Sequence, residues 1–455
     1  MNPRSTDVID LEEQPNSAGP LEPALPRLST YESAFAGLRK VTNGREIWAI
    51  ADQALVSGTN FLTNVIVARS LGVTEFGVFA LAWMAMLFFY SMQMALISAP
   101  MMSIGPKTPA AARRSYWGAV SVQELVFALS ASALISLGLK LVATLTHQPG
   151  LARLTYPLCI ATVAYLLQDF VRRYFFTTRQ SRRAFLNDAV SCLPQLPIIF
   201  FFLRLHLIGI PGVLWIFAIT SLVGVGLGAY WLEPISFTFR EIKATAARHW
   251  TISRWTAPSW LLSWMSTNFI AVLAPVYYGA AAAGALRASQ NIVAVSHIWI
   301  LVMDNVMPAE AAHRLHESGI AAMSRYLKGM ALRWGGLTAG FAFVIGVAPQ
   351  FWLRLIYGPQ FAGYGTILRM YCIVYLLIFI GGPVRAALQA MEYTAPYVWA
   401  QTGAATFALL AGIPLTRKFG LIGVLTGSIA TLLILQGIFA WALARRLQVA
   451  RTCKA

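Results

Sequence analysis

The chain has 455 residues, of which 57% are hydrophobic and 12% are charged. A soluble globular protein carries about 25% charged residues, so this composition, with a mean hydropathy of +0.62, excludes a soluble domain and indicates a membrane protein that crosses the bilayer many times. The net charge of +17 does not predict a nucleic-acid partner, because the basic residues are scattered between apolar segments rather than gathered on one domain.

The first 45 residues contain five prolines and several acidic residues but show no apolar periodicity. We predict a disordered cytoplasmic tail over residues 1–45. This segment lacks the basic start and apolar core of a signal peptide, so the first pair of apolar segments is expected to direct insertion. The four cysteines form no CxxC pair, and neither a disulfide framework nor a metal site is predicted.

Long apolar segments follow the tail. The first, residues 46–69, reaches about 36 Å as a helix, which exceeds the roughly 30 Å of a bilayer core. We predict an all-α polytopic membrane fold with about twelve transmembrane helices, at residues 46–69, 74–98, 116–145, 151–176, 183–204, 211–233, 256–279, 284–309, 330–356, 364–390, 393–416 and 420–445.

The two halves of this array resemble each other. Three matches occur in the same order: Gly72 and Gly77 with Gly279 and Gly284 at an offset of 207 residues, Tyr165-Leu166-Leu167 with Tyr375-Leu376-Leu377 at 210, and Gly209-x-x-Gly212-Val213-Leu214 with Gly420-x-x-Gly423-Val424-Leu425 at 211. These matches predict a duplicated six-helix unit. The expected domains are an N-terminal lobe at 46–233 and a C-terminal lobe at 256–446, related by an axis along the membrane normal, with a substrate path between them.

The segment between the lobes, residues 234–255, is basic and amphipathic. Arg240, Lys243, Arg248 and Arg254 supply charge to a helix that we expect to lie on an anionic leaflet, with anionic lipids as partners. Of the 35 Lys and Arg residues, 26 fall on the side of the termini when the spans alternate. The positive-inside rule therefore predicts that both termini, including the tail at 447–455, are cytoplasmic.

The first span is unusually polar for a helix that faces lipid. Asp52 and Asn60 lie on or beside one stripe of this helix, and burying a carboxylate or an amide against hydrocarbon costs several kcal/mol. We predict that both residues line a cleft between the lobes. For the threonines of the same stripe, cleft lining and simple close packing of helices remain equally open.

The eighth span carries the clearest candidate site. Gln290, His297 and Asp304 recur every seven residues, and Arg287 lies one turn earlier, so a continuous helix places all four on one side. Arg287 is a candidate cation for a diphosphate headgroup, and His297 or Asp304 for proton coupling. The alternatives are that Arg287 reaches toward the outer surface and Asp304 toward the cytoplasmic one. No resident cofactor and no catalytic residue are predicted, and coupling to H⁺ or Na⁺ is an open expectation.

The repeat carries a resemblance to a known family. The first hairpin reads Ala68-Arg69-Ser70-Leu71-Gly72 and then Phe76-Gly77-Val78-Phe79, and the second half opens with Tyr278-Gly279 and Ala283-Gly284-Ala285-Leu286. With six plus six helices, this resembles the polysaccharide-transporter family, which includes the O-antigen flippases. That family belongs to the superfamily of multidrug, oligosaccharidyl-lipid and polysaccharide exporters.

The resemblance implies a flippase. Such a protein moves a lipid-linked oligosaccharide from the cytoplasmic to the outer leaflet of a bacterial inner membrane, through a cleft that opens to each side in turn. Contact with the polysaccharide polymerase machinery is a further expectation. A multidrug or organic-cation antiporter of the same superfamily is the main alternative. An integral membrane polymerase or ligase is less favoured, because the outward loops are too short to assemble an active site and the sequence contains no HExxH or phosphate-binding glycine loop.

Overall fold

The computed structural model describes residues 44–145, 149–393 and 395–452. Over these ranges the chain is helical and contains no β-strand, so the predicted all-α polytopic membrane fold is confirmed. Of the predicted N-terminal tail, residues 1–43 lie outside the described ranges. The chain divides into residues 1–47 and a compact unit of residues 48–455, and the contacts described below lie within the second unit.

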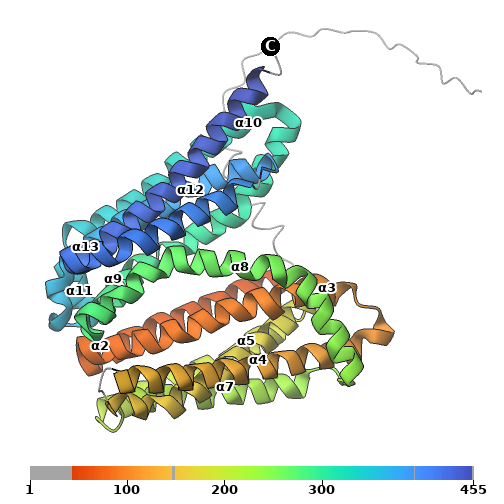
Figure 1. Cartoon of the computed structure of the whole chain (residues 1–455), viewed down its shortest axis with the longest axis vertical. Helices are drawn as coiled ribbons and strands as arrows, with labels where there is room; N and C mark the ends of the chain where they lie inside the picture. The colour runs from red at the N-terminus through yellow and green to blue at the C-terminus, as the bar shows by residue number, and fades with distance from the viewer. Residues whose placement is uncertain (1–43, 146–148, 394, 453–455) are drawn as a thin grey trace, which may run out of the picture. The chain divides into compact units, whose positions relative to one another are not determined.

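Figure 1 shows the helices in chain order. The long helices are α2 (Gly44–Gln93), α4 (Ala110–Leu145), α5 (Thr155–Thr177), α6 (Ser181–Arg204), α7 (Ile210–Trp231), α8 (Phe239–Tyr278), α9 (Ala280–Ala294), α10 (His297–Val347), α12 (Gly365–Ala390) and α13 (Ala395–Thr452). Shorter elements connect them: η1 (Met94–Ser98), α3 (Ala99–Ile104), η2 (Gly105–Lys107), η3 (Pro149–Leu154), α11 (Pro349–Tyr357) and η4 (Pro359–Tyr364).

Nine helices in the described ranges are long and apolar enough to cross a membrane. Two of them are much longer than one crossing requires. The first, Ile47–Lys107, has 61 residues, about three times the length that a bilayer core requires, and it bends at Gly72. The second, Ala395–Gln448, has 54 residues and bends at Gly420. The bend at Gly72 lies between the predicted spans 46–69 and 74–98, and the bend at Gly420 falls on the first residue of the predicted span 420–445.

Two expectations about continuity differ from the structure. The predicted eighth span is not one helix, because α9 ends at Ala294 and α10 begins at His297. The predicted linker helix at 234–255 is not separate, because residues from Phe239 onward form one 40-residue helix with the following span. Its first half is held by the Ser253 hydroxyl, which donates to the Leu96 carbonyl at 3.0 Å, and by contacts with α4.

The backbone supports the predicted duplication. Gly72 has φ 86° and ψ 179°, and its counterpart Gly279 has φ 76° and ψ 178°. A positive φ of this kind is open to glycine at little cost but strains other residues. The same local bend therefore separates the first two helical passes of each half, 207 residues apart.

The helices pack mainly within their own half. In the first half α5 packs against α4, α6 and α7; in the second half α12 packs against α10 and α13, and α13 also packs against α8. The close approach of α8 and α13 depends on small residues: a Cβ on Gly412 or Gly427 would lie 3.2 or 3.0 Å from Ile270. Small residues at such contacts let membrane helices gain van der Waals packing.

The halves also meet at the end that carries the Gly72 bend. Arg69 donates to the Leu355 carbonyl, and Gln360 donates to the Ala68 carbonyl at 3.2 Å. The ring of Phe76 is fully buried and packs edge-on against Phe361, with 6.1 Å between ring centroids. These contacts close this end of the space between the halves.

Candidate functional site

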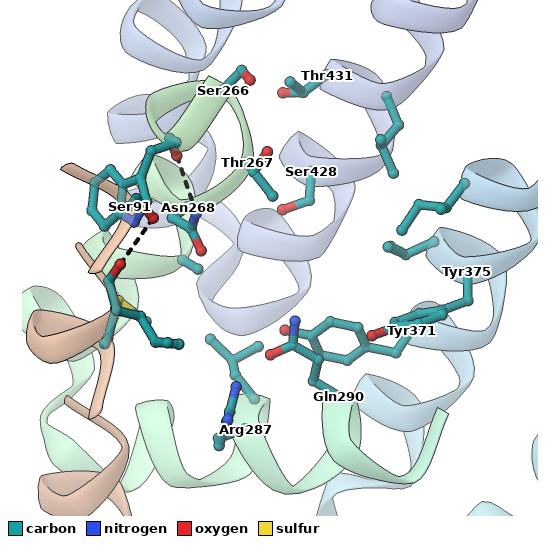
Figure 2. Close-up of a pocket in the computed structure, with 18 of the residues that line it drawn as sticks. Ser91, Ser266, Thr267, Asn268, Arg287, Gln290, Tyr371, Tyr375, Ser428 and Thr431 are labelled. Atoms are coloured by element: carbon teal, nitrogen blue, oxygen red, sulfur yellow. Dashed lines mark hydrogen bonds between the residues drawn. The ribbon is translucent and has the colours of Figure 1, made fainter. Parts of the chain in front are cut away.

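A cavity of about 390 Å³ lies between the helices of the two halves (Figure 2). Its walls come from α2, α8, α9, α12 and α13, so it has the position of the predicted cleft. We call it the central cavity. Its polar and aromatic lining residues are Trp83, Tyr90, Ser91, Trp264, Ser266, Thr267, Asn268, Arg287, Gln290, Tyr371, Tyr375, Gln401, Ser428 and Thr431.

Arg287 is the cationic residue of this lining. The lining contains no Asp or Glu, and Arg287 forms no ion pair with any described residue. Its Nε atom is buried and has no hydrogen-bond partner. Burying a guanidinium without a counter-charge costs free energy. The central cavity is therefore suited to bind an anion, which would supply the missing negative charge.

Arg287 and Gln290 project from α9 one turn apart, and Gln290 lies beside Tyr371 and Tyr375 of α12 (Figure 2). Both positions come from the predicted polar stripe of the eighth span. Gln290 can donate and accept hydrogen bonds through its amide, so this wall offers a fixed charge next to an adaptable polar group and two aromatic rings.

The opposite wall offers hydroxyl and amide groups. Several of them donate to carbonyls of their own helices: Ser91 to Leu87 at 2.9 Å, Asn268 to Trp264 at 3.2 Å, Ser428 to Val424 at 2.9 Å and Thr431 to Gly427 at 2.8 Å. These bonds satisfy donors and leave hydroxyl and amide oxygens able to accept. The wall can therefore accept hydrogen bonds from a ligand rich in hydroxyl groups.

The other two members of the predicted stripe are not among the residues that line the central cavity. The helix is interrupted between Ala294 and His297, although Val295 and Ser296 keep dihedral angles in the right-handed helical region. His297 is exposed, and Asp304 is 3.2 Å from Arg385 of α12 in an ion pair. The structure thus brings Arg287 and Gln290 together but separates them from His297 and Asp304.

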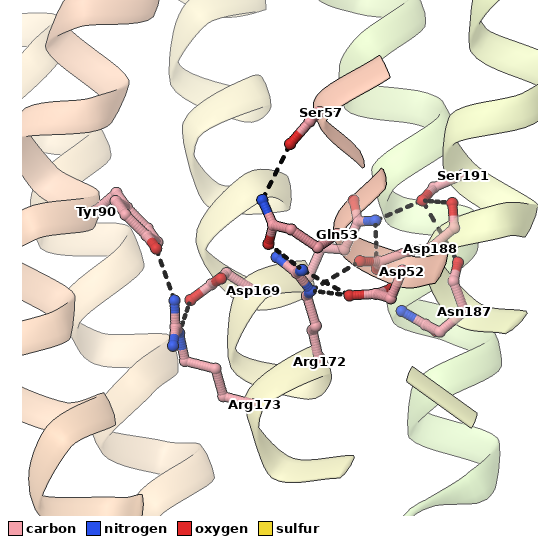
Figure 3. A network of polar contacts seen from close by, with 11 residues as sticks. Asp52, Gln53, Ser57, Tyr90, Asp169, Arg172, Arg173, Asn187, Asp188 and Ser191 are labelled. Atoms are coloured by element: carbon pink, nitrogen blue, oxygen red, sulfur yellow. Dashed lines mark hydrogen bonds and ion pairs between the residues drawn. The ribbon is translucent and has the colours of Figure 1, made fainter. Parts of the chain in front are cut away.

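Asp52 belongs to a second polar cluster, inside the first half (Figure 3). Its carboxylate is fully buried and lies 2.6 Å from the Arg172 guanidinium. The same guanidinium is 3.1 Å from Asp188. Arg172 therefore bridges two carboxylates from α2 and α6. The sequence shows that Asp52 must face a polar partner, but it does not identify Arg172, which is 120 residues away.

A neighbouring pair extends this cluster toward the central cavity. Arg173 binds Asp169 at 2.6 Å in an i,i+4 ion pair and donates to the Tyr90 hydroxyl at 2.6 Å. Tyr90 lines both the central cavity and a cavity of about 70 Å³ that adjoins the cluster. Asn60, predicted for the cleft, lines this smaller cavity instead.

Sequence reasoning did not foresee most of the central cavity. Tyr371, Ser428 and Thr431 come from spans that show no polar stripe. One signal was available, since Tyr375 belongs to a repeat match with Tyr165, and Tyr165 in turn lines the small cavity of the first half. The match marks two positions that both line cavities.

Comparison with known proteins identifies the fold. No family model and no curated protein sequence matches the chain. Among solved structures, it is similar to a multidrug resistance MATE family transporter of the MOP superfamily in its inward-facing conformation, with 14% identity, a TM-score of 0.68 and coverage of 89% of this chain and 96% of that one. An outward-facing MATE transporter of the MOP superfamily gives a TM-score of 0.56 at 14% identity, over 89% of this chain and 95% of that one.

The lipid II flippase MurJ in an inward closed conformation is similar to nearly the same degree. Its TM-score is 0.67 at 13% identity, with coverage of 88% of this chain and 87% of the flippase. The chain therefore has the fold of the MOP superfamily transporters.

Proposed function

We propose that this protein, which has the fold of the MOP superfamily transporters, is a flippase for a lipid-linked oligosaccharide in a bacterial inner membrane. In this proposal both termini are cytoplasmic. A polysaccharide precursor, joined to its lipid through a diphosphate, enters the central cavity from the cytoplasmic leaflet and leaves toward the outer leaflet. The sequence resemblance to O-antigen flippases and the chemistry of the central cavity support this choice.

The observation that carries the proposal is Arg287. A guanidinium that faces a cavity without carboxylates attracts an anion, and its planar fork matches the oxygens of a diphosphate. The rest of the lining suits a sugar chain: hydroxyl and amide groups pair with sugar hydroxyls, while Trp83 and Trp264 offer apolar faces.

The main alternative is an organic-cation antiporter. An organic cation needs a carboxylate in the cavity, or a cage of aromatic rings with no positive charge beside it. The lining of the central cavity contains the positive charge of Arg287 and no acidic residue. Of the buried acidic residues in the first half, Asp169 and Asp52 are paired with Arg173 and Arg172, and Glu124 does not line the central cavity. The charge of the central cavity therefore favours an anionic substrate over a cationic one.

An integral membrane polymerase or ligase is the alternative from a different class. General acid and base catalysis needs titratable side chains within reach of a shared substrate atom, and the central cavity offers no carboxylate or histidine. Similarity to transporters and a flippase rather than to enzymes also favours transport. Contact with polymerase machinery in the membrane remains part of the proposal.

Deleting the gene tests the proposed function. We expect lipid-linked repeat units to accumulate, unpolymerised, in the cytoplasmic leaflet while their cytoplasmic synthesis continues. Protection of these units from an impermeant glycosidase added to the outer face of the inner membrane measures their sidedness. Normal surface polysaccharide in the deletion strain, with no second transporter present, contradicts the proposal.

Coupling to H⁺ or Na⁺ is a separate part of the proposal. Everted membrane vesicles that contain the protein and a labelled lipid-linked glycan provide the assay. We expect one of two treatments to slow flipping: collapse of the proton gradient with a protonophore if H⁺ is the coupling ion, or removal of Na⁺ if Na⁺ is. Equal rates in all conditions would show that the substrate gradient alone drives transport.

A further inference from the structure

A second opening lies beside the central cavity, between α8 and the first turns of α13. This side cavity has a volume of about 280 Å³ and is lined by Ser259, Trp260, Leu262, Ser263, Tyr397, Val398 and Gln401. Its surface is mostly apolar. Trp260 and Val398 are 40% and 57% exposed, so the side cavity opens toward the surroundings of the helix bundle.

The side cavity exists because α8 and α13 do not pack evenly along their length. Around Ile270 the two helices are in close contact through Gly412 and Gly427. At Trp260, almost three turns earlier on α8, that contact is replaced by the cavity. Trp260 precedes the end of α8 at Tyr278 by 18 residues, about 27 Å along a helix, which places it near one boundary of the bilayer core.

The side cavity and the central cavity are continuous in their lining. Gln401 lines both, and the hydroxyl of Ser266, a central-cavity residue, donates to the Gln401 side chain at 2.8 Å. Ser263 of the side cavity lies one turn before Ser266 on α8. The hydrogen bond between Ser266 and Gln401 thus lies where the apolar opening adjoins a polar cavity that contains a cation.

We propose that the side cavity holds the first part of the hydrocarbon tail of the substrate while the diphosphate and sugars occupy the central cavity. This inference rests on the proposed function. An amphiphile with an anionic head needs a polar cavity with a cation next to an apolar cavity that reaches the bilayer, and these two spaces share Gln401 as a lining residue. Displacing the Gln401 side chain from Ser266 lets the head pass between them.

The test compares two probes with the same head, inorganic pyrophosphate and farnesyl diphosphate, bound to the full-length protein in phosphatidylethanolamine–phosphatidylglycerol nanodiscs. Val398→Trp fills the side cavity from an exposed position, where a larger side chain is compatible with folding. The matched control is Val276→Trp on α8, which is 70% exposed and lines neither cavity. Partitioning of the prenyl probe into the nanodisc is the same for all variants.

We expect Val398→Trp to weaken farnesyl diphosphate binding about tenfold, the loss that accompanies removing roughly two buried methylene groups. Pyrophosphate binding is expected to be unchanged in the same variant, and Val276→Trp is expected to bind both probes as the unmodified protein does. Arg287→Gln is expected to weaken the binding of both pyrophosphate and farnesyl diphosphate.

Each outcome has a distinct meaning. If farnesyl diphosphate binds equally well to the unmodified protein and to Val398→Trp, the tail does not use the side cavity, and this inference is overturned. In that case the proposed function stands, provided that pyrophosphate still binds through Arg287. If pyrophosphate does not bind, or binds equally well to Arg287→Gln, the anionic-substrate proposal is overturned together with this inference.

Discussion

Gly77 of α2 and Gly284 of α9 meet backbone to backbone. A Cβ on Gly77 would lie 1.7 Å from the Ala280 carbonyl oxygen, and a Cβ on Gly284 would lie 2.2 Å from the Val73 carbonyl oxygen. At the repeat offset of 207 residues, Val73 corresponds to Ala280 and Gly77 corresponds to Gly284. The two contacts are therefore copies of each other, and the halves meet here through the same surface of each repeat.

This contact predicts that Gly77→Ala prevents closure of the Gly72 end, because a methyl group cannot occupy the space of a carbonyl oxygen. A cysteine at Gln290, in a background whose four native cysteines are replaced by alanine, is expected to react roughly tenfold faster with an impermeant thiol reagent added outside the cell. Gly58→Ala is the matched control on α2, since no atom lies within 4 Å of its Cβ. Equal reactivity of the two variants contradicts the prediction.

Arg287→Gln is expected to reduce flipping roughly tenfold or more, because it removes the charge that binds the diphosphate. The flipping rate of Arg287→Lys is expected to lie between those of the unmodified protein and Arg287→Gln, since lysine keeps the positive charge but loses the two parallel N–H donors of the guanidinium. Initial rates in reconstituted vesicles provide the measurement. Arg325→Gln removes the same charge from an exposed site on α10 and is expected to have no effect. Full activity of Arg287→Gln would show that the charge of Arg287 is not needed for substrate binding.

The bridge made by Arg172 predicts a large effect on stability. Arg172→Gln leaves the buried carboxylates of Asp52 and Asp188 without their cation, and breaking a buried ion pair from one side costs about 3–5 kcal/mol. The melting temperature of the purified protein is expected to fall clearly. Arg314→Gln, which removes an exposed i,i+4 pair with Glu310, is expected to change it little. A small and equal effect of both substitutions would argue against the bridge.

The charge distribution predicts the topology. A phosphatase reporter that is active only in the periplasm is expected to be inactive when fused after Arg446 and active when inserted after His206, in the turn between α6 and α7. The expected pattern follows from the excess of Lys and Arg on the side of the termini. The reverse pattern would place the Gly72 end in the cytoplasm and reverse the proposed direction of entry.

Local properties of the sequence predicted the fold. The long apolar segments specify membrane helices, because helix length and side-chain hydropathy follow from neighbouring residues alone. The bends at Gly72 and Gly279 were also predictable, since glycine and the turn chemistry around it act within a few residues. The repeat offset then linked the two halves without any knowledge of their packing.

The sequence by itself thus determined the helical architecture and predicted a duplication and a functional cation at Arg287, while the tertiary structure decided what each polar residue faces. Helical periodicity shows which side chains share a face, but not which helix lies opposite, so the pairing of Asp52 with Arg172 could only come from packing between distant segments. Asp304 shares the seven-residue spacing of Gln290 but lies in an ion pair with Arg385 instead of in the lining of the central cavity, because the packing of α10 against α12 decides which polar partner it meets. The central cavity depends on five helices from both halves, and its lining is a property of their arrangement rather than of any one span.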